Sequence, residues 1–247
     1  MITLIQNILR KIWKLWAAVM ASLVTLGLSP LLLISVSTPR FYGFFSVLAR
    51  IWSFLILLLS GFIFCVKGRK KIDRKRQYMV VANHSSILDI MLSYVAVPLP
   101  MMFIGKESLA RIPVFGWIYR ASNIMVERTS LESRRGVLPK AKAEIARGRS
   151  ICIYPEGTSK HITKRLIPFK DGAFVIAIDC GIPILPVTFL DNCRLFPSEK
   201  PHEGHPGILR AIIDDPIETT GMTIADKEAL KQRVFDLLDS RLEEAGR

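Results

Sequence analysis

The chain has 247 residues, half of them apolar, and a formal net charge of +13. This length accommodates one domain plus an appendage and excludes a small disulfide-stapled scaffold. The charge is concentrated in residues 1–76, which hold 12 lysines and arginines against one acidic residue, whereas residues 77–247 hold 22 against 20. We expect no nucleic-acid partner, because the basic residues belong to no recognition motif and are not interleaved with aromatic ones.

Two uncharged apolar segments come first, at residues 15–37 and 51–66. At about 1.5 Å per residue, the first is long enough to cross a hydrocarbon core of about 30 Å, whereas the second, at roughly 24 Å, is short. We expect a two-helix membrane anchor, either a hairpin of two spans or a pair of helices that dips into one leaflet. A cleaved signal peptide fits the first segment less well, because its apolar run exceeds about 15 residues.

A basic cluster, KGRKKIDRKR at residues 67–76, directly follows the second apolar segment. Lysines and arginines beside apolar segments mark the cytoplasmic side, and each contributes about 1 kcal/mol of attraction to an anionic membrane surface. The cluster therefore predicts contact with membrane phospholipids and a domain that faces the cytoplasm. We divide the chain into a membrane anchor, residues 1–76, and one following domain, residues 77–247.

From residue 77 onward, short apolar strands alternate with amphipathic stretches. This alternation predicts an α/β fold with a mostly buried, mixed sheet flanked by helices. Strands are expected at 78–82, 101–105, 123–127, 150–155, 182–189 and 208–217, and helices near 86–97, 106–120, 130–147, 170–180 and 223–244.

Polar residues gather where the first of these strands ends, in NHSSILD at residues 83–89. His84 and Asp89 are five residues apart, about 140° around a continuous helix, so they meet only if His84 lies in the turn and Asp89 in the first helical turn. In that arrangement Asp89 sets the tautomer of His84, and the imidazole becomes a general base for a hydroxyl. The alternative is a capping box between Ser86 and Asp89, which is a purely structural role.

Two other strand ends carry groups that suit a phosphate. YPEGTSK at residues 154–160 offers Gly157 for close backbone approach, and the side chains of residues 158–160 supply donors. Arg128 ends the preceding strand with a guanidinium fork that fits an anion. Each signal taken alone also fits an ordinary solvated loop. Because strand ends share one crevice in an α/β sheet, however, we expect these groups beside His84.

No metal or cofactor site is expected. The four cysteines form no C-x-x-C pair, and His202 and His205 are too few ligands for zinc. The absence of Walker A, G-x-G-x-x-G and G-x-S-x-G motifs argues against a nucleotide cofactor and a serine hydrolase. Residues 77–170 hold 14 lysines and arginines against six acidic residues, which favours an anionic ligand.

Taken together, these motifs resemble the membrane-bound glycerolipid acyltransferases, specifically the bacterial 1-acylglycerol-3-phosphate acyltransferases. NHSSILD (83–89) is similar to the family's N-H-x4-D block, KESLARIPVFGWIYRASNIMVER (106–128) to its second block, and YPEGTSK (154–160) to its F-P-E-G-T-R-S block. The order and spacing hold through about residues 80–190. The resemblance implies a glycerol-3-phosphate acyltransferase-like fold and a place on the inner (cytoplasmic) membrane.

The resemblance also implies an activity: acyl transfer from acyl-CoA or acyl carrier protein (acyl-ACP) to the free sn-2 hydroxyl of 1-acylglycerol 3-phosphate, giving phosphatidic acid without a cofactor. His84 would be the catalytic base and Asp89 its partner. The acceptor's glycerol phosphate would be held by Arg128, Glu156, Gly157, Thr158 and Lys160. The arginine that follows E-G-T in the family is Ser159 here. This change leaves the acceptor open, with a lyso-aminolipid and glycerol 3-phosphate as the alternatives. A separate alternative, of a different class, is a non-catalytic membrane lipid binder that kept the fold.

Overall fold

The computed structural model describes residues 2–111, 115–127, 129–159, 165–200 and 203–246. Its centre is a seven-stranded sheet in the order β1-β7-β6-β2-β5-β3-β4. All neighbouring strands pair in parallel except β6 and β7, so the sheet is mixed. The strands are β1 Phe62–Lys67, β2 Met79–Ala82, β3 Met101–Lys106, β4 Asn123–Val126, β5 Ser150–Ile153, β6 Ile184–Phe189 and β7 Gly207–Ile213.

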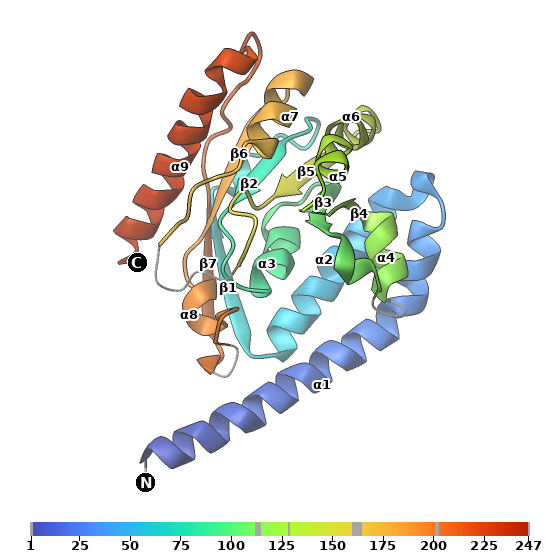
Figure 1. Ribbon diagram of the computed structural model, residues 1–247. Coiled ribbons are helices and arrows are strands. Elements are labelled where there is room, and N and C mark those ends of the chain that lie inside the picture. Colours follow the sequence, from blue (N-terminus) through green and yellow to red (C-terminus); the bar gives the residue numbers. More distant parts are fainter. Residues whose placement is uncertain (1, 112–114, 128, 160–164, 201–202, 247) are drawn as a thin grey trace.

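Helices cover both faces of the sheet, with α2 and α3 on one face and α6, α7 and α9 on the other (Figure 1). Strands β2 and β6 are buried at every position, as expected for strands covered on both sides. The predicted α/β fold with a mixed sheet flanked by helices is confirmed. The helices are α1 Ile2–Val36, α2 Tyr42–Leu59, α3 Leu88–Ala96, α4 Phe115–Ser122, α5 Leu131–Arg135, α6 Val137–Ala146, α7 Gly172–Cys180, α8 Asn192–Leu195 and α9 Lys227–Glu244.

The second apolar segment, expected as one helix over residues 51–66, contains two elements. α2 ends at Leu59, and Gly61 turns the chain with a φ of 83°, a conformation that other residues rarely adopt. Phe62 then begins β1, which pairs in parallel with β7. Aromatic and β-branched residues fit an edge strand as well as an apolar helix, so composition did not separate the two. The predicted boundary at residue 76 therefore falls after the first strand of the sheet.

Two of the expected helices are divided. The stretch over 130–147 forms α5 and α6, which meet at Gly136. The stretch over 106–120 begins with a short 3-10 helix at residues 107–111, ahead of α4. Divisions of this kind change the ends of elements and leave the order of strands and helices as expected.

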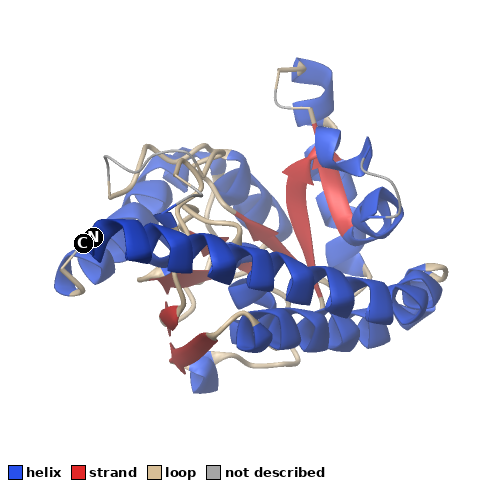
Figure 2. Ribbon diagram, turned by 90° about the horizontal axis from the view of Figure 1, so that it is seen from below, coloured by secondary structure: helices blue, strands red, loops and turns tan. Residues whose placement is uncertain are grey.

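Helices α1 and α2 are candidate membrane anchors. Both are long and apolar enough to cross a membrane, and they run side by side (Figure 2). Leu15 and Leu26 on α1 are 67% and 68% exposed. Trp13 and Trp16 of α1 donate indole N–H hydrogen bonds, of 2.9 and 2.8 Å, to two carbonyls at the C-terminal end of α2. An extended apolar surface on a closely joined helix pair is typical of contact with lipid.

Contacts at the start of α2 fix the helix pair to the sheet. The Tyr42 hydroxyl donates a 2.7 Å hydrogen bond to the carbonyl of Met101 in β3. The Arg149 guanidinium lies 3.8 Å from the centroid of the Tyr42 ring and donates a 3.1 Å hydrogen bond to the carbonyl of Pro39. Glu144 balances the charge of Arg149 in an ion pair. These buried contacts set the orientation of the helix pair relative to the strands.

Candidate active site

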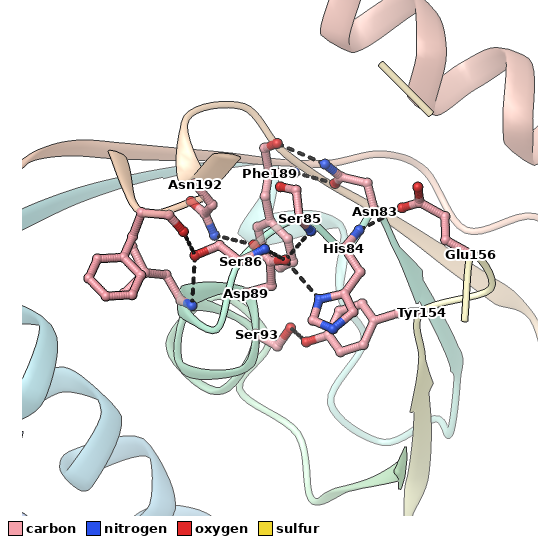
Figure 3. Close-up of polar contacts among 12 residues, drawn as sticks. Asn83, His84, Ser85, Ser86, Asp89, Ser93, Tyr154, Glu156, Phe189 and Asn192 are labelled. Carbon is pink, nitrogen blue, oxygen red and sulfur yellow. Dashed lines mark hydrogen bonds and ion pairs between the residues drawn. The ribbon is translucent and has the colours of Figure 1, made fainter. Parts of the chain in front are cut away.

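His84 lies in the turn after β2, at the carboxyl edge of the sheet (Figure 3). β2 ends at Ala82 and α3 begins at Leu88, so His84 belongs to neither element. Its Nδ1 atom lies 2.9 Å from Oδ2 of Asp89, and 16% of the His84 side chain is exposed. The structure thus brings the two residues together in the one arrangement that their spacing allowed.

The Asp89 carboxylate is fully buried and bound on both oxygens. Besides the imidazole of His84, Oδ2 accepts hydrogen bonds from the backbone N–H groups of Ser85 and Ser86, at 2.7 and 2.8 Å. Oδ1 accepts a 2.7 Å hydrogen bond from the side-chain amide of Asn192. The cap and the contact with His84 are therefore made by the same carboxylate. Because its oxygens accept, Nδ1 of His84 carries the hydrogen, and Nε2 is the nitrogen that takes up a proton.

Asn192 is a site residue that the sequence reasoning missed. It is buried at the start of α8, just after β6. β6 runs parallel to β2, so residues that follow the two strands reach the same edge of the sheet. Asn83 joins these segments further, because its side chain exchanges two hydrogen bonds, of 3.0 and 2.8 Å, with the backbone of Phe189. The available signal was an aspartate–asparagine pair directly after an apolar strand.

The ring of Tyr154 stacks on the imidazole of His84, with centroids 4.3 Å apart and 17° between the planes. The Tyr154 hydroxyl lies 2.9 Å from Oγ of Ser93. Burial raises the pKa of Tyr154 well above its ordinary value, so the hydroxyl stays protonated at physiological pH. The ring therefore fixes the plane of the imidazole and adds no charge beside it.

Glu156 links the E-G-T turn to the turn that carries His84. Its carboxylate is buried, and Oε1 accepts a 2.7 Å hydrogen bond from the backbone N–H of His84 (Figure 3). Oε2 accepts a longer hydrogen bond, of 3.4 Å, from the N–H of Ile167. These contacts position the backbone of the site. The expected part of Glu156 in holding the acceptor stays a prediction.

The other residues expected at a phosphate site are only partly described. Gly157 has a φ of 71°, and its N–H donates a 3.0 Å hydrogen bond that closes a turn on the carbonyl of Tyr154. Thr158 follows it and is half-buried. Arg128 and Lys160 lie outside the described residues. The structure therefore places Gly157 and Thr158 after β5, and the assignment of Arg128 and Lys160 stays a prediction.

An apolar cavity of about 170 Å³ extends from His84 toward the helix pair. His84 and Tyr154 form part of its wall, and the rest comes from α1 to α4 and from β3 and its flanks. Its apolar lining includes Leu32, Phe45, Trp52, Phe103 and Ile118. The general-base candidate is therefore adjacent to a space that suits a hydrocarbon chain.

The segment that carries this geometry also matches a family model. The model, described as Acyltransferase, matches residues 63–190, just over half of the chain. The chain belongs to the acyltransferase family. The resemblance drawn from the N-H-x4-D and E-G-T motifs is thereby confirmed.

Several curated relatives of this acyltransferase are named 1-acyl-sn-glycerol-3-phosphate acyltransferase. One from Chlamydomonas reinhardtii is 33% identical over 54% of this chain and 40% of its own length. One from Saccharomyces cerevisiae is 28% identical over 81% of this chain and 66% of its own length. One from Escherichia coli is 32% identical over 56% of this chain and 58% of its own length. The matched regions thus span between 40% and 66% of these three relatives.

The fold is shared with a solved structure, the 1-acyl-sn-glycerophosphate (LPA) acyltransferase from Thermotoga maritima. The TM-score is 0.79, and the match covers 95% of this chain and 97% of that one. Sequence identity is 23%, so this likeness concerns the fold. It extends over the sheet and the N-terminal helix pair together.

Proposed function

We propose that this acyltransferase moves a fatty acyl group from acyl-CoA or acyl-ACP to the sn-2 hydroxyl of 1-acylglycerol 3-phosphate, giving phosphatidic acid. The observation that carries the proposal is the 2.9 Å contact between Nδ1 of His84 and the buried carboxylate of Asp89. The apolar cavity beside His84 supports a fatty acyl substrate. The names of the curated relatives support the choice of acceptor.

The reaction needs a general base and no covalent enzyme intermediate. Nε2 of His84 takes the proton of the acceptor hydroxyl while its oxygen attacks the carbonyl carbon of the thioester. The carbon–oxygen bond forms, the carbon–sulfur bond breaks, and the thiolate leaves with the proton that the imidazolium returns. Asp89 stabilises the imidazolium between these steps. Because a thioester is already activated, the reaction requires no metal or cofactor.

The helix pair supports action on a bilayer lipid from one leaflet. One side of α2 is buried against the sheet domain through residues such as Phe45, Leu48 and Leu57, so this helix is not free to be surrounded by lipid. α1, in contrast, is largely exposed. We therefore place the pair in the cytoplasmic leaflet of the inner membrane, where a cytosolic donor reaches the domain. Because residues of α1 and α2 line the apolar cavity, the cavity then lies next to the lipid.

Part of the basic cluster remains available for membrane phospholipids. Arg69 donates hydrogen bonds to carbonyls at the end of α3, and Lys71 and Arg76 form ion pairs with acidic residues near the C-terminal part of the domain. Lys70, Arg74 and Lys75 are exposed, and no carboxylate among the described residues forms an ion pair with their side chains. These cations suit anionic headgroups close to the anchor.

An acceptor panel tests the proposal. Purified protein is assayed with acyl-CoA and with acyl-ACP, and with lysophosphatidate, glycerol 3-phosphate and a lyso-aminolipid as acceptors. We expect lysophosphatidate to be acylated and His84→Ala to lower kcat by about 10²- to 10⁴-fold. Acylation of another acceptor without lysophosphatidate would contradict the proposed substrate. If the protein is instead a lipid binder without catalytic activity, the His84→Ala substitution would leave phosphatidate synthesis in cells unchanged.

A further inference from the structure

A second cavity lies beyond the ring of Tyr154. Its volume is about 550 Å³, within the range of roughly 300–1,000 Å³ that is usual for ligand pockets. Tyr154 and Ile104 line both cavities and separate them. Val137 of α6 and Ile176 of α7 cover the second cavity, and its described lining includes no residue of α1 or α2. It therefore opens on the face of the sheet opposite the helix pair.

Arg134 of α5 and Lys170, just before α7, line this cavity with positive charge. In the described part of the chain, neither side chain has a carboxylate within ion-pair distance. Asp171 also lines the cavity, but its two oxygens lie 2.7 Å from the ammonium groups of Lys227 and Lys231 on α9. The negative charge of Asp171 is thus balanced by α9, and the cations of the cavity suit an anionic ligand.

Gly157 is what lets Lys170 reach the E-G-T turn. A Cβ atom at position 157 would lie 2.7 Å from Nζ and 2.9 Å from Cε of Lys170, so a larger residue would displace that side chain. The backbone N–H of Lys170 donates a 2.9 Å hydrogen bond to the carbonyl of Pro155, which holds the residue against the same turn. The ammonium of Lys170 is therefore held beside the E-G-T turn. Ser159, which replaces the family's arginine, directly follows this motif in the sequence.

We propose that Arg134 and Lys170 bind a phosphate group of one of the two substrates in this cavity, and that they supply the charge missing at position 159. The inference rests on the proposed function. The acceptor carries a phosphate on its glycerol, and both donors carry phosphate at the end of pantetheine, as a diphosphate in acyl-CoA and as a phosphodiester in acyl-ACP. A guanidinium and an ammonium that face one cavity give the bidentate and point-charge contacts that phosphate oxygens accept. Tyr154 separates this charge from the imidazole of His84.

Steady-state kinetics with each substrate varied in turn tests the cavity. In Arg134→Gln/Lys170→Gln, we expect the KM of the substrate that binds here to rise about tenfold or more, with kcat nearly unchanged. A rise for lysophosphatidate alone assigns the cavity to the acceptor, and a rise for acyl-CoA or acyl-ACP alone assigns it to the donor. Unchanged KM values, or equal increases for both substrates, would overturn the inference. Lys170→Arg retains the charge and is expected to restore most of the affinity.

A matched control removes equal charge outside the cavity. Arg135→Gln/Lys140→Gln changes two exposed cations on α5 and α6 that do not line it. We expect wild-type KM values for both substrates in this control. The Tm of each variant, measured in the same detergent, identifies any variant that has lost its fold.

Binding without turnover separates this inference from the proposed function. Calorimetric titration of wild type and double variant with coenzyme A, and separately with lysophosphatidate, measures the phosphate contact directly. An inactive wild type that still binds one ligand, with affinity about tenfold weaker in the double variant, would sink the proposed acyl transfer and support the cavity. Equal affinities for both ligands in wild type and a folded double variant would show that the cavity binds no phosphate, whatever the activity.

Discussion

Asp89 combines a structural role with an electrostatic one at a single buried carboxylate. Two backbone N–H groups and the amide of Asn192 hold its oxygens, so the carboxylate does not need to reorganise when His84 becomes charged. The stacked ring of Tyr154 restrains the imidazole from the other side. At the scale of residues, the site is therefore organised before any substrate binds.

Asp89→Asn is expected to preserve the fold and remove most of the activity. The new amide keeps one oxygen for the backbone N–H groups, while its NH₂ group faces the side-chain amide of Asn192. The Asn192 amide can flip so that its Oδ1 accepts a hydrogen bond from this NH₂ group, because Oδ1 has no other hydrogen-bond partner among the described residues. Without the negative charge the imidazolium is less stable, so kcat should fall by about 10²- to 10⁴-fold. Thermal unfolding and kcat, measured on the same sample, check the expected stability and the expected loss of activity. A large drop in Tm with little specific loss of activity would instead favour a purely structural capping role for Asp89.

At the scale of elements, the segment after β6 supports the turn after β2. The Asp191 carboxylate accepts three hydrogen bonds from Arg210 of β7. One, of 3.0 Å, comes from the backbone N–H, and two, each of 2.8 Å, come from the guanidinium. These contacts join the start of α8 to the antiparallel strand β7. The neighbouring residue, Asn192, is thereby held against Asp89.

Asp191→Asn is expected to destabilise the protein at neutral pH and progressively less in acid. Burial acts to raise the pKa of Asp191, but the hydrogen bonds and charge of Arg210 outweigh it, so the pKa is lower than usual. A pKa depressed by folding contributes stability above the unfolded value of about 3.9, and this contribution is lost as pH falls through the depressed value. Denaturant unfolding at pH 7 and near pH 3 measures the difference from wild type, which should shrink in acid.

Asp215→Asn serves as the control for this pH experiment. Asp215 also pairs with a cation, Lys71, but its side chain is 82% exposed. Exposed ion pairs contribute little to stability, so the free energy of unfolding should hardly change at either pH. A destabilisation by Asp191→Asn that is equal at both pH values would contradict the role assigned to the charge.

At the scale of the whole molecule, the apolar helix pair and the exposed cations of the basic cluster are close in sequence and belong to one end of the chain. The proposed phosphate cavity, by contrast, opens on the sheet face away from the helix pair. Under the proposed function, the face that carries the helix pair meets lipid and the opposite face meets the cytosol. The two proposed substrates, a bilayer lipid and a soluble thioester, would then come from these two sides.

Lys70→Gln/Arg74→Gln/Lys75→Gln is expected to weaken binding to anionic membranes by about 100-fold, since each cation contributes about 1 kcal/mol near such a surface. Co-sedimentation with phosphatidylcholine vesicles that contain phosphatidylglycerol measures the loss. Binding to pure phosphatidylcholine should not change. Arg135→Gln/Lys140→Gln/Lys142→Gln removes the same charge from α5 and α6, and an equal loss in that control would show a general charge effect.

By itself the sequence determined the α/β class, the acyltransferase motifs and the one arrangement in which His84 and Asp89 can meet. These features are local, because strand alternation, the turn after a strand and a five-residue spacing are all set within a short stretch of chain. The tertiary structure alone decided that β1 joins the sheet beside β7, that Asn192 binds Asp89, and that Arg134 and Lys170 share a cavity. Each of these depends on contacts between segments far apart in sequence, which only the packing of the complete sheet brings together.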